Sequence, residues 1–180
     1  MSADVRLVVT PTSAIVAAYL DVVRALMDDA FEGDFSAEDW RHALGGTHVL
    51  AWDGGDLLGH ASLIARQLLI DRRPIRAGYV EAVGVRTDRQ RQGIGARLMD
   101  EIERLIRESY ELGALGDSDA GFEFYRVRGW QPWLGPTYAD GPAGVVRTED
   151  DDGAILVLPV RARLDLTGTL ACGWREGDVW

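Results

Sequence analysis

A glutamine and two glycines stand between a valine-rich segment and an apolar helical pattern, at a spacing suited to binding phosphate. The segment Tyr79 to Arg86 predicts a mostly buried strand, and apolar residues between 99 and 106 recur at helical spacing. Gln90, Gly93 and Gly95 lie between them. Glycines at the start of a helix let the backbone approach a ligand, and N–H groups without an intrahelical partner attract anions. The segment therefore predicts a binding loop for an anionic cofactor.

The spacing in this loop does not fit two common phosphate-binding motifs. The loop of nucleotide hydrolases needs a lysine, and this chain has none; the dinucleotide fingerprint needs three glycines, and the loop has two. The order Gln90-Arg91-Gln92-Gly93-Ile94-Gly95 after a strand resembles the acetyl-CoA pyrophosphate loop of the GNAT superfamily of N-acyltransferases. The alternative is an ordinary turn between a strand and a helix.

The length of 180 residues predicts one domain over residues 1–180, with a sizeable core. No segment approaches the roughly 20 apolar residues that span a bilayer, so we expect a cytoplasmic protein without membrane contact. The single cysteine, Cys172, is expected to be a small buried residue. The three histidines, His42, His48 and His60, have no spacing typical of a metal site. We interpret each as a surface or core histidine and predict no metal.

The net charge of −10 comes from 29 acidic and 19 basic residues, and all the basic residues are arginine. Such a charge repels nucleic acid and anionic membranes and favours cationic ligands through long-range attraction. The alternative is an acidic surface that serves only solubility. A run of acids between residues 28 and 34 is interleaved with Phe31 and Phe35, and within it Asp34 is a candidate for the edge of a pocket.

The periodicity predicts an α/β fold with a mixed, mainly antiparallel sheet flanked by helices. Strands are expected, besides Tyr79–Arg86, at Val5–Val9, His48–Trp52, Leu57–Ile70, Gly113–Gly116, Trp130–Leu134 and, as the last strand, Ala154–Val160. One helix is expected over residues 15–26, and Ser36 with Asp39 resembles the capping box of a short second helix. Ser118 is expected to cap a helix carrying Phe122, Tyr125 and Val127, and residues 135–153 are expected to form a loop.

Five strings in order narrow the resemblance to one family. They are GDFSAEDWRHALGGTHVLAW, GYVEAVGVR, LGALGDSDAGFEFYRVRGWQPWLGPT, DDDGAILVLPV and the tail WREGDVW. Together they resemble the aminoglycoside 2′-N-acetyltransferases of actinobacteria. The resemblance covers nearly the whole chain and implies the GNAT fold, acetyl-CoA as the acetyl donor and a homodimer.

The resemblance also implies which residues bind the two substrates. The cofactor set is Val83, Gly84 and Val85, for the pantetheine arm, and Gln90, Arg91, Gln92, Gly93, Ile94 and Gly95, for the pyrophosphate. The set for the cationic aminosugar is Asp34, Glu81, Ala82, Gly116, Asp150, Asp151, Asp178 and Trp180. The family often has serine where Gly116 stands, so a side-chain hydrogen bond at that place would have to come from Asp117 or Ser118.

The chemistry of acetyl transfer gives Glu81 and Tyr125 distinct roles. An ammonium cannot attack a thioester, so a carboxylate such as Glu81 must accept its proton, directly or through water. The departing thiolate has a free pKa of about 8.5 and gains from a proton that Tyr125 would donate, the role the resemblance implies for this tyrosine. The alternatives are a solvent-facing Glu81 on an antiparallel strand and a core Tyr125.

The sequence therefore predicts an enzyme that transfers acetyl directly from acetyl-CoA to the 2′-amine of an aminoglycoside antibiotic. One alternative is an N-acetyltransferase of another amine, such as a cell-wall aminosugar or a polyamine. The other is a non-enzymatic module that senses acyl-CoA. For Trp180 we expect its terminal carboxylate to face a substrate ammonium, and the alternative is simple anchoring of the tail.

Overall fold

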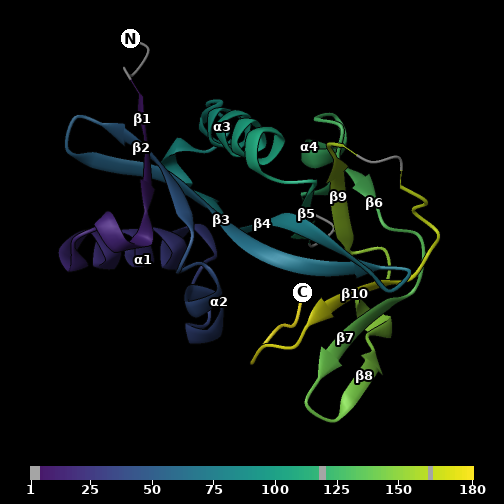
Figure 1. Cartoon of the computed structure of the whole chain (residues 1–180). Coiled ribbons are helices and arrows are strands. Elements are labelled where there is room, and N and C mark those ends of the chain that lie inside the picture. Colours follow the sequence, from purple (N-terminus) through teal and green to yellow (C-terminus); the bar gives the residue numbers. More distant parts are fainter. Residues whose placement is uncertain (1–4, 118–120, 162–163) are drawn as a thin grey trace. The chain divides into compact units, whose positions relative to one another are not determined.

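The computed structural model describes residues 5–117, 121–161 and 164–180, and the chain divides into two compact units. The first unit comprises the chain up to Ile64 together with Val80–Arg104. The second comprises Ala65–Tyr79 and Leu105–Trp180. Strands β3 (Asp56–Ile70) and β4 (Arg73–Val85) and helix α3 (Ile94–Ser109), labelled in Figure 1, each contribute residues to both units.

The first unit is built on antiparallel strands. Strand β2 (Thr47–Asp53) pairs with β1 (Arg6–Pro11) on one side and with β3 on the other, and β4 is the next neighbour of β3. The chain turns between Asp53 and Asp56, which form the last pair of β2 and β3. A bulge between Ala51 and Trp52 shifts the register by one residue. Shifting a register by one residue changes which side chains share a face of the sheet, and this matters for the histidines below.

Helices α1 (Ala17–Ala30) and α2 (Ala37–His42) belong to the first unit, and the 3-10 turn η1 (Thr12–Ala14) precedes α1. Buried residues of α1 form a cluster with residues of β2, β3 and the α1–α2 connection: Val23, Leu26, Met27, Phe35, Leu50 and Leu57. The predicted capping box is confirmed, because the Asp39 N–H donates to Ser36 Oγ at 3.0 Å and the Ser36 N–H donates to the Asp39 carboxylate at 2.9 Å.

The second unit contains the remaining strands. They are β5 (Leu112–Gly116), β6 (Gln131–Pro132), β7 (Thr137–Gly141), β8 (Gly144–Arg147), β9 (Ile155–Pro159) and β10 (Leu170–Gly173). Strand β5 runs parallel to β4 and antiparallel to β9, which also pairs with β6. Strand β10 runs antiparallel to β3 and parallel to β7, and β7 forms a hairpin with β8. The predicted mixed, mainly antiparallel sheet is thus confirmed.

Several boundaries differ from the sequence predictions. The segment 135–153 is not a loop, since it contains the β7–β8 hairpin and the 3-10 turn η3 (Glu149–Asp151). The last strand is β10 rather than the one after Ala154, and the strand expected at Trp130–Leu134 shortens to β6. Helix α4 (Phe122–Arg126) ends before Val127, and its expected cap, Ser118, lies outside the described residues.

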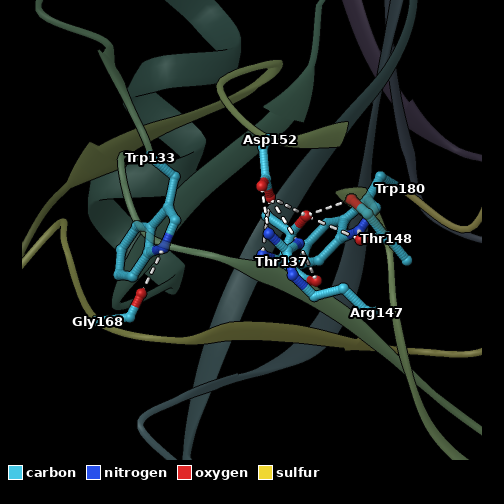
Figure 2. A network of polar contacts seen from close by, with 7 residues as sticks. All are labelled: Trp133, Thr137, Arg147, Thr148, Asp152, Gly168 and Trp180. Atoms are coloured by element: carbon cyan, nitrogen blue, oxygen red, sulfur yellow. Dashed lines mark hydrogen bonds and ion pairs between the residues drawn. The ribbon is translucent and has the colours of Figure 1, made fainter. Parts of the chain in front are cut away.

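Cys172 is buried, as expected, and two tryptophans share the core of the second unit, whereas Trp174 is exposed. Trp130, Trp133 and Cys172 are almost fully buried in the second unit. The Trp133 indole N–H donates to the Gly168 carbonyl at 3.0 Å, so its one polar atom is satisfied (Figure 2). Within the described part of the chain, every helix is too short or too polar to cross a bilayer.

Candidate active site

The predicted cofactor loop joins the 3-10 turn η2 (Thr87–Arg89) to the start of α3. Arg91 and Gly93 have left-handed backbone conformations, with φ of 58° and 82°. The Gly93 carbonyl accepts a hydrogen bond from the Arg97 N–H at 3.1 Å, which places Gly93 at the helix start. Because the opening N–H groups of a helix have no intrahelical acceptor, this exposed start can hold a phosphate. The predicted order of strand, glycine loop and helix is confirmed.

Two glutamine side chains fix the shape of this loop. The Gln90 side-chain amide donates to the Val85 carbonyl, and the Gln92 amide donates to the Asp88 carbonyl, both at 3.3 Å. Each bond ties a loop residue back to the segment before it. The glutamine side chains therefore stabilise the loop through carbonyl acceptors outside it, and they do not occupy its backbone N–H groups, which are the candidate donors to a phosphate.

Asp29 stabilises the turn η2 that precedes this loop, a role that the sequence analysis missed. It lies near the end of α1, and its Oδ2 accepts from both the N–H and the hydroxyl of Thr87, at 2.9 and 2.5 Å. These two hydrogen bonds hold the pKa of the Asp29 carboxyl below its ordinary value. In the sequence Asp29 was one member of an acidic run, and its contact with a residue 58 positions away gave no local signal.

The segment assigned to the pantetheine arm is the end of β4. Gly84 is buried, and a Cβ at this position would lie 2.3 Å from the Met27 Cε of α1. Val83 and Val85 on either side are half-buried. A larger residue at Gly84 would displace the end of the Met27 side chain and would also crowd the Ala30 Cβ, at 3.1 Å, so the glycine allows α1 to pack closely on β4.

Glu81 and Ala82 lie at an irregular point of β4. Ala82 has a left-handed φ of 49°, which is unusual for a residue with a Cβ and interrupts the regular alternation of a strand. The Glu81 carbonyl accepts from the Ser62 hydroxyl at 3.2 Å, and the Ala82 carbonyl accepts from the His60 ring at 2.8 Å. Side chains of β3 thus bond the backbone of β4 here. The Glu81 side chain is half-buried.

Tyr125 lies on the short helix α4 between two other aromatic rings. Phe124 and Trp130 make edge contacts with it, at centroid distances of 5.1 and 6.0 Å. Burial, and secondarily the negative charge of Asp117, raise the pKa of Tyr125 well above its ordinary value. The phenol therefore stays protonated throughout the neutral range. It can donate a proton or a hydrogen bond, but it does not act as a base.

Acidic residues of the second unit lie close enough to Asp151 to influence its charge. Asp150 and Asp151 belong to η3, and burial together with the charge of Asp178 raises the pKa of Asp151. A carboxylate close to a second negative charge is stabilised in its ionised form by a nearby cation. Asp152 behaves differently, because hydrogen bonds from Arg147 and Thr137 lower its pKa.

Trp180 is buried and held by a chain of polar contacts (Figure 2). Its indole N–H donates to the Thr148 hydroxyl at 3.0 Å, and that hydroxyl donates to Thr137 Oγ1 at 2.8 Å. Thr137 Oγ1 lies 3.0 Å from Asp152 Oδ1, and Arg147 pairs with the same carboxylate. The final residue is thus anchored to the β7–β8 hairpin. The anchoring expected as the alternative for Trp180 is present.

Two arginines hold the backbone of the tail, and the sequence analysis missed both. Arg175 donates to the Trp180 main-chain oxygen and, through Nε, to the Asp178 carbonyl at 2.8 Å. Arg66 donates to the Val179 carbonyl at 2.8 Å. The main-chain oxygen of Trp180 is therefore in contact with a guanidinium. Arg175 is five residues before Trp180, and this short separation in the sequence could have suggested the contact.

Gly116 and Asp34 are the remaining predicted substrate residues. A Cβ at Gly116 would lie 3.4 Å from the Tyr79 hydroxyl and 3.9 Å from the main-chain carbon of Trp180. A serine there would thus meet both groups, and glycine leaves that space open. Asp34 is exposed in the turn between α1 and α2, where its N–H donates to the Phe31 carbonyl at 2.9 Å.

The predicted site residues fall into two groups, one in each unit. The first unit holds Asp34, Glu81, Ala82, Val83, Gly84, Val85 and residues 90–95. The second unit holds Gly116, Tyr125, Asp150, Asp151, Asp178 and Trp180. The first group contains the candidate phosphate loop and the candidate base, and the second contains the candidate acid and most of the carboxylates.

Comparison with known proteins identifies the family. Residues 13–133 match the family model described as "Acetyltransferase (GNAT) domain". The chain therefore belongs to the GNAT acetyltransferase family, whose members use acetyl-CoA as the acetyl donor, and it is an acetyl-CoA-dependent N-acetyltransferase.

One curated relative is the aminoglycoside 2′-N-acetyltransferase of Mycolicibacterium fortuitum, 48% identical over 161 residues, which are 87% of this chain and 83% of that protein. A GNAT family acetyltransferase from Brucella melitensis in complex with acetyl-CoA is 17% identical, with a TM-score of 0.60 over 92% of this chain and 95% of that chain. Escherichia coli ElaA is 16% identical, with a TM-score of 0.62 over 85% and 98% of the two chains. The two solved structures support the fold.

Proposed function

We propose that this enzyme acetylates the 2′-amine of aminoglycoside antibiotics by direct transfer from acetyl-CoA. The observation that carries the proposal is the 48% identity with the Mycolicibacterium fortuitum aminoglycoside 2′-N-acetyltransferase over most of both chains. The substrate is a polycation, and the net charge of −10 is of the complementary sign. The carboxylates Asp34, Asp150, Asp151 and Asp178 are assigned to its ammonium groups.

Acetyl-CoA supplies a thioester carbonyl that an amine can attack. The loop from Gln90 to Gly95 is assigned to its pyrophosphate, because the exposed helix start and the left-handed Gly93 suit a close-lying phosphate. The backbone of Val83, Gly84 and Val85 is assigned to the pantetheine arm.

Glu81 is assigned as the general base that accepts the proton of the substrate ammonium, directly or through water. Ala82 would orient the same amine through its backbone. Tyr125 is assigned as the general acid: its raised pKa keeps it protonated, and it stabilises the developing thiolate by donating a hydrogen bond or the proton.

Trp180 and Asp178 are assigned to the substrate side, with one change from the sequence expectation. Arg175 contacts the terminal oxygen of Trp180, so this oxygen cannot be treated as an unpaired ligand. We propose that Arg175 orients the terminal carboxylate, and that the remaining lone pairs of this carboxylate accept hydrogen bonds from the substrate. Gly116 is proposed to widen the space beside Tyr79, which would influence the choice among aminoglycosides.

Thiol release from acetyl-CoA in the presence of an aminoglycoside, a cell-wall aminosugar and a polyamine tests this proposal. We expect release with the aminoglycoside at the highest kcat/KM. A higher kcat/KM with either of the other amines would favour the alternative N-acetyltransferase. Binding of CoA without thiol release for any amine would favour the sensing module.

We further propose that residues 1–180 act as one catalytic domain in a cytoplasmic homodimer, without nucleic acid or membrane as a partner. The passage of β3 and β4 through both units supports a single domain. The acidic charge supports the absence of nucleic-acid binding. Light scattering after size-exclusion chromatography measures the oligomeric state, and a mass of one chain would reject the dimer.

A further inference from the structure

Two histidines lie buried side by side in the first unit. His48 of β2 and His60 of β3 have no exposed surface, and their rings are 5.1 Å apart between centroids. His48 Nδ1 lies 2.8 Å from His60 Nε2, and His60 Nδ1 lies 2.8 Å from the Ala82 carbonyl oxygen. At the other end, His48 Nε2 lies 2.7 Å from the Thr12 hydroxyl. Thr12, His48 and His60 thus form a hydrogen-bonded series that ends on β4, termed the histidine chain.

The position of every proton in the histidine chain follows from its last member. A carbonyl oxygen can only accept, so His60 Nδ1 must carry the proton that it donates to Ala82. In a neutral His60, Nε2 is then an acceptor, which requires a proton on His48 Nδ1. His48 Nε2 is in turn an acceptor for the Thr12 hydroxyl, whose contact with this nitrogen, at 2.7 Å, is shorter than its contact with the Gly46 carbonyl, at 3.3 Å. Thr12 Oγ1 itself accepts from the Gly45 N–H at 2.9 Å. Burial of both rings favours their neutral forms, and in these forms both carry their proton on Nδ1.

This order of donors and acceptors excludes a proton relay and favours a role in positioning the backbone. A proton relay needs a final group that can release or take up a proton, and a backbone carbonyl does neither at neutral pH. A fixed series of donors instead holds its acceptor in place. Burial lowers the pKa of His48 to about 4, and burial with the neighbouring His48 lowers that of His60 to about 3, in agreement with two neutral rings.

The acceptor is at the irregular point of β4. Ala82 has its left-handed φ there, and the preceding carbonyl, of Glu81, accepts from the buried Ser62 hydroxyl. His60 and Ser62 are two residues apart on β3, so their side chains lie on the same face and bond two successive carbonyls of β4. Left-handed conformations of residues with a Cβ are costly and persist where surrounding contacts impose them. His60 and Ser62 supply such contacts.

We propose that the histidine chain is a positioning device for the reaction, in which His60 holds the left-handed Ala82 and thereby aims the Glu81 carboxylate. This inference rests on the proposed role of Glu81 as the base. It makes His48, His60 and Thr12 determinants of the rate although both histidines are fully buried. The asparagine amide offers a donor close to the position of a histidine Nδ1, so His60→Asn keeps the bond to Ala82, and His60→Leu removes it.

The test compares kcat, KM and melting temperature for His60→Leu, His60→Asn and Val49→Ala, with acetyl-CoA and tobramycin. Val49 is fully buried on β2 beside His48, and the alanine variant controls for lost packing. We expect kcat to fall about tenfold to a hundredfold in His60→Leu, as for a misplaced catalytic group. The kcat of His60→Asn should be at least about fivefold higher than that of His60→Leu. Val49→Ala should melt earlier with an unchanged kcat.

Equal losses of kcat in the leucine and asparagine variants, or an unchanged kcat in folded His60→Leu, would overturn the positioning role. Nitrogen chemical shifts of the two rings provide a second readout that does not depend on turnover. We expect Nδ1 to be protonated in both, and a proton on His60 Nε2 would overturn the histidine chain itself. A wild-type enzyme that is inactive on every amine would contradict the proposed function instead, and the ring spectrum would still decide the geometry.

Discussion

Lowering the pH from 7.5 to 5.5 should destabilise this protein through its two buried histidines. A histidine whose pKa is lowered by folding contributes its full stability above the unfolded pKa, near 6.5, and loses it as the pH falls toward the folded value. The folded values, about 4 for His48 and about 3 for His60, place pH 5.5 inside this window for both rings. The folded state stays neutral there while the unfolded state takes up protons.

The magnitude follows from the proton uptake of the unfolded chain. One pH unit below its pKa, an unfolded histidine favours unfolding by about 1.4 kcal/mol, so two histidines contribute roughly 3 kcal/mol. This is a large share of the 5 to 15 kcal/mol typical of a domain. With a urea m-value of about 2 kcal/mol/M, the midpoint should fall by roughly 1.5 M. The carboxyls of Asp29 and Asp152, whose pKa values are lowered, lose their contributions only below their unfolded pKa of 3.8.

Urea titrations at half-unit steps of pH measure how far the unfolding midpoint falls as the pH is lowered. The double variant His48→Asn with His60→Asn is the matched control. Asparagine does not titrate and can keep a donor to the Ala82 carbonyl. The difference between wild type and variant isolates the two rings from all other titrating groups. A wild-type midpoint that is flat from pH 7.5 to 5.5, or a slope that the double variant shares, would refute the neutral buried pair.

The cofactor loop, the proton transfers and the tail give three further predictions. Gly95→Val should crowd the helix start and weaken acetyl-CoA binding by about tenfold, or 1.4 kcal/mol, in calorimetry; unchanged affinity in a folded variant would contradict the phosphate site. Glu81→Gln should lower kcat about a hundredfold, and Tyr125→Phe should slow the same step; full activity of both across pH would remove their assigned roles. One glycine added after Trp180 keeps the oxygen that contacts Arg175 but moves the charge by about 3.5 Å, so KM for aminoglycoside should rise with unchanged melting, and a constant KM would reject the carboxylate as a ligand.

Local patterns in the sequence predicted local structure well. The capping box of Ser36 and Asp39 depends on atoms three residues apart, and the loop from Gln90 to Gly95 depends on glycines beside a strand and a helix. The β7–β8 hairpin was missed because glycine and proline near residues 141–144 were interpreted as a loop rather than as the turn of a hairpin. Strand β10 is only four residues long and offers too short a pattern.

The histidine chain could not be predicted, and the reason is one inserted residue. Counting back from the turn at Asp53 and Asp56 without a bulge would place His60 opposite Val49, on the face away from His48. The bulge between Ala51 and Trp52 shifts the pairing, so that His60 lies opposite Leu50 and shares the face of His48. No residue type in this segment marks the bulge. Contacts of the tail with Arg66, more than 100 positions away, were equally beyond local inference.

The position of the acetyl group on the product tests the proposed activity most directly. Tobramycin incubated with the enzyme and acetyl-CoA should gain the mass of one acetyl group, and NMR of the purified product should locate it on the 2′-nitrogen. A reaction without enzyme and one with Glu81→Gln serve as controls. Acetylation at a different nitrogen, or tobramycin recovered unmodified while another amine is acetylated, would contradict the assignment of this chain as an aminoglycoside 2′-N-acetyltransferase.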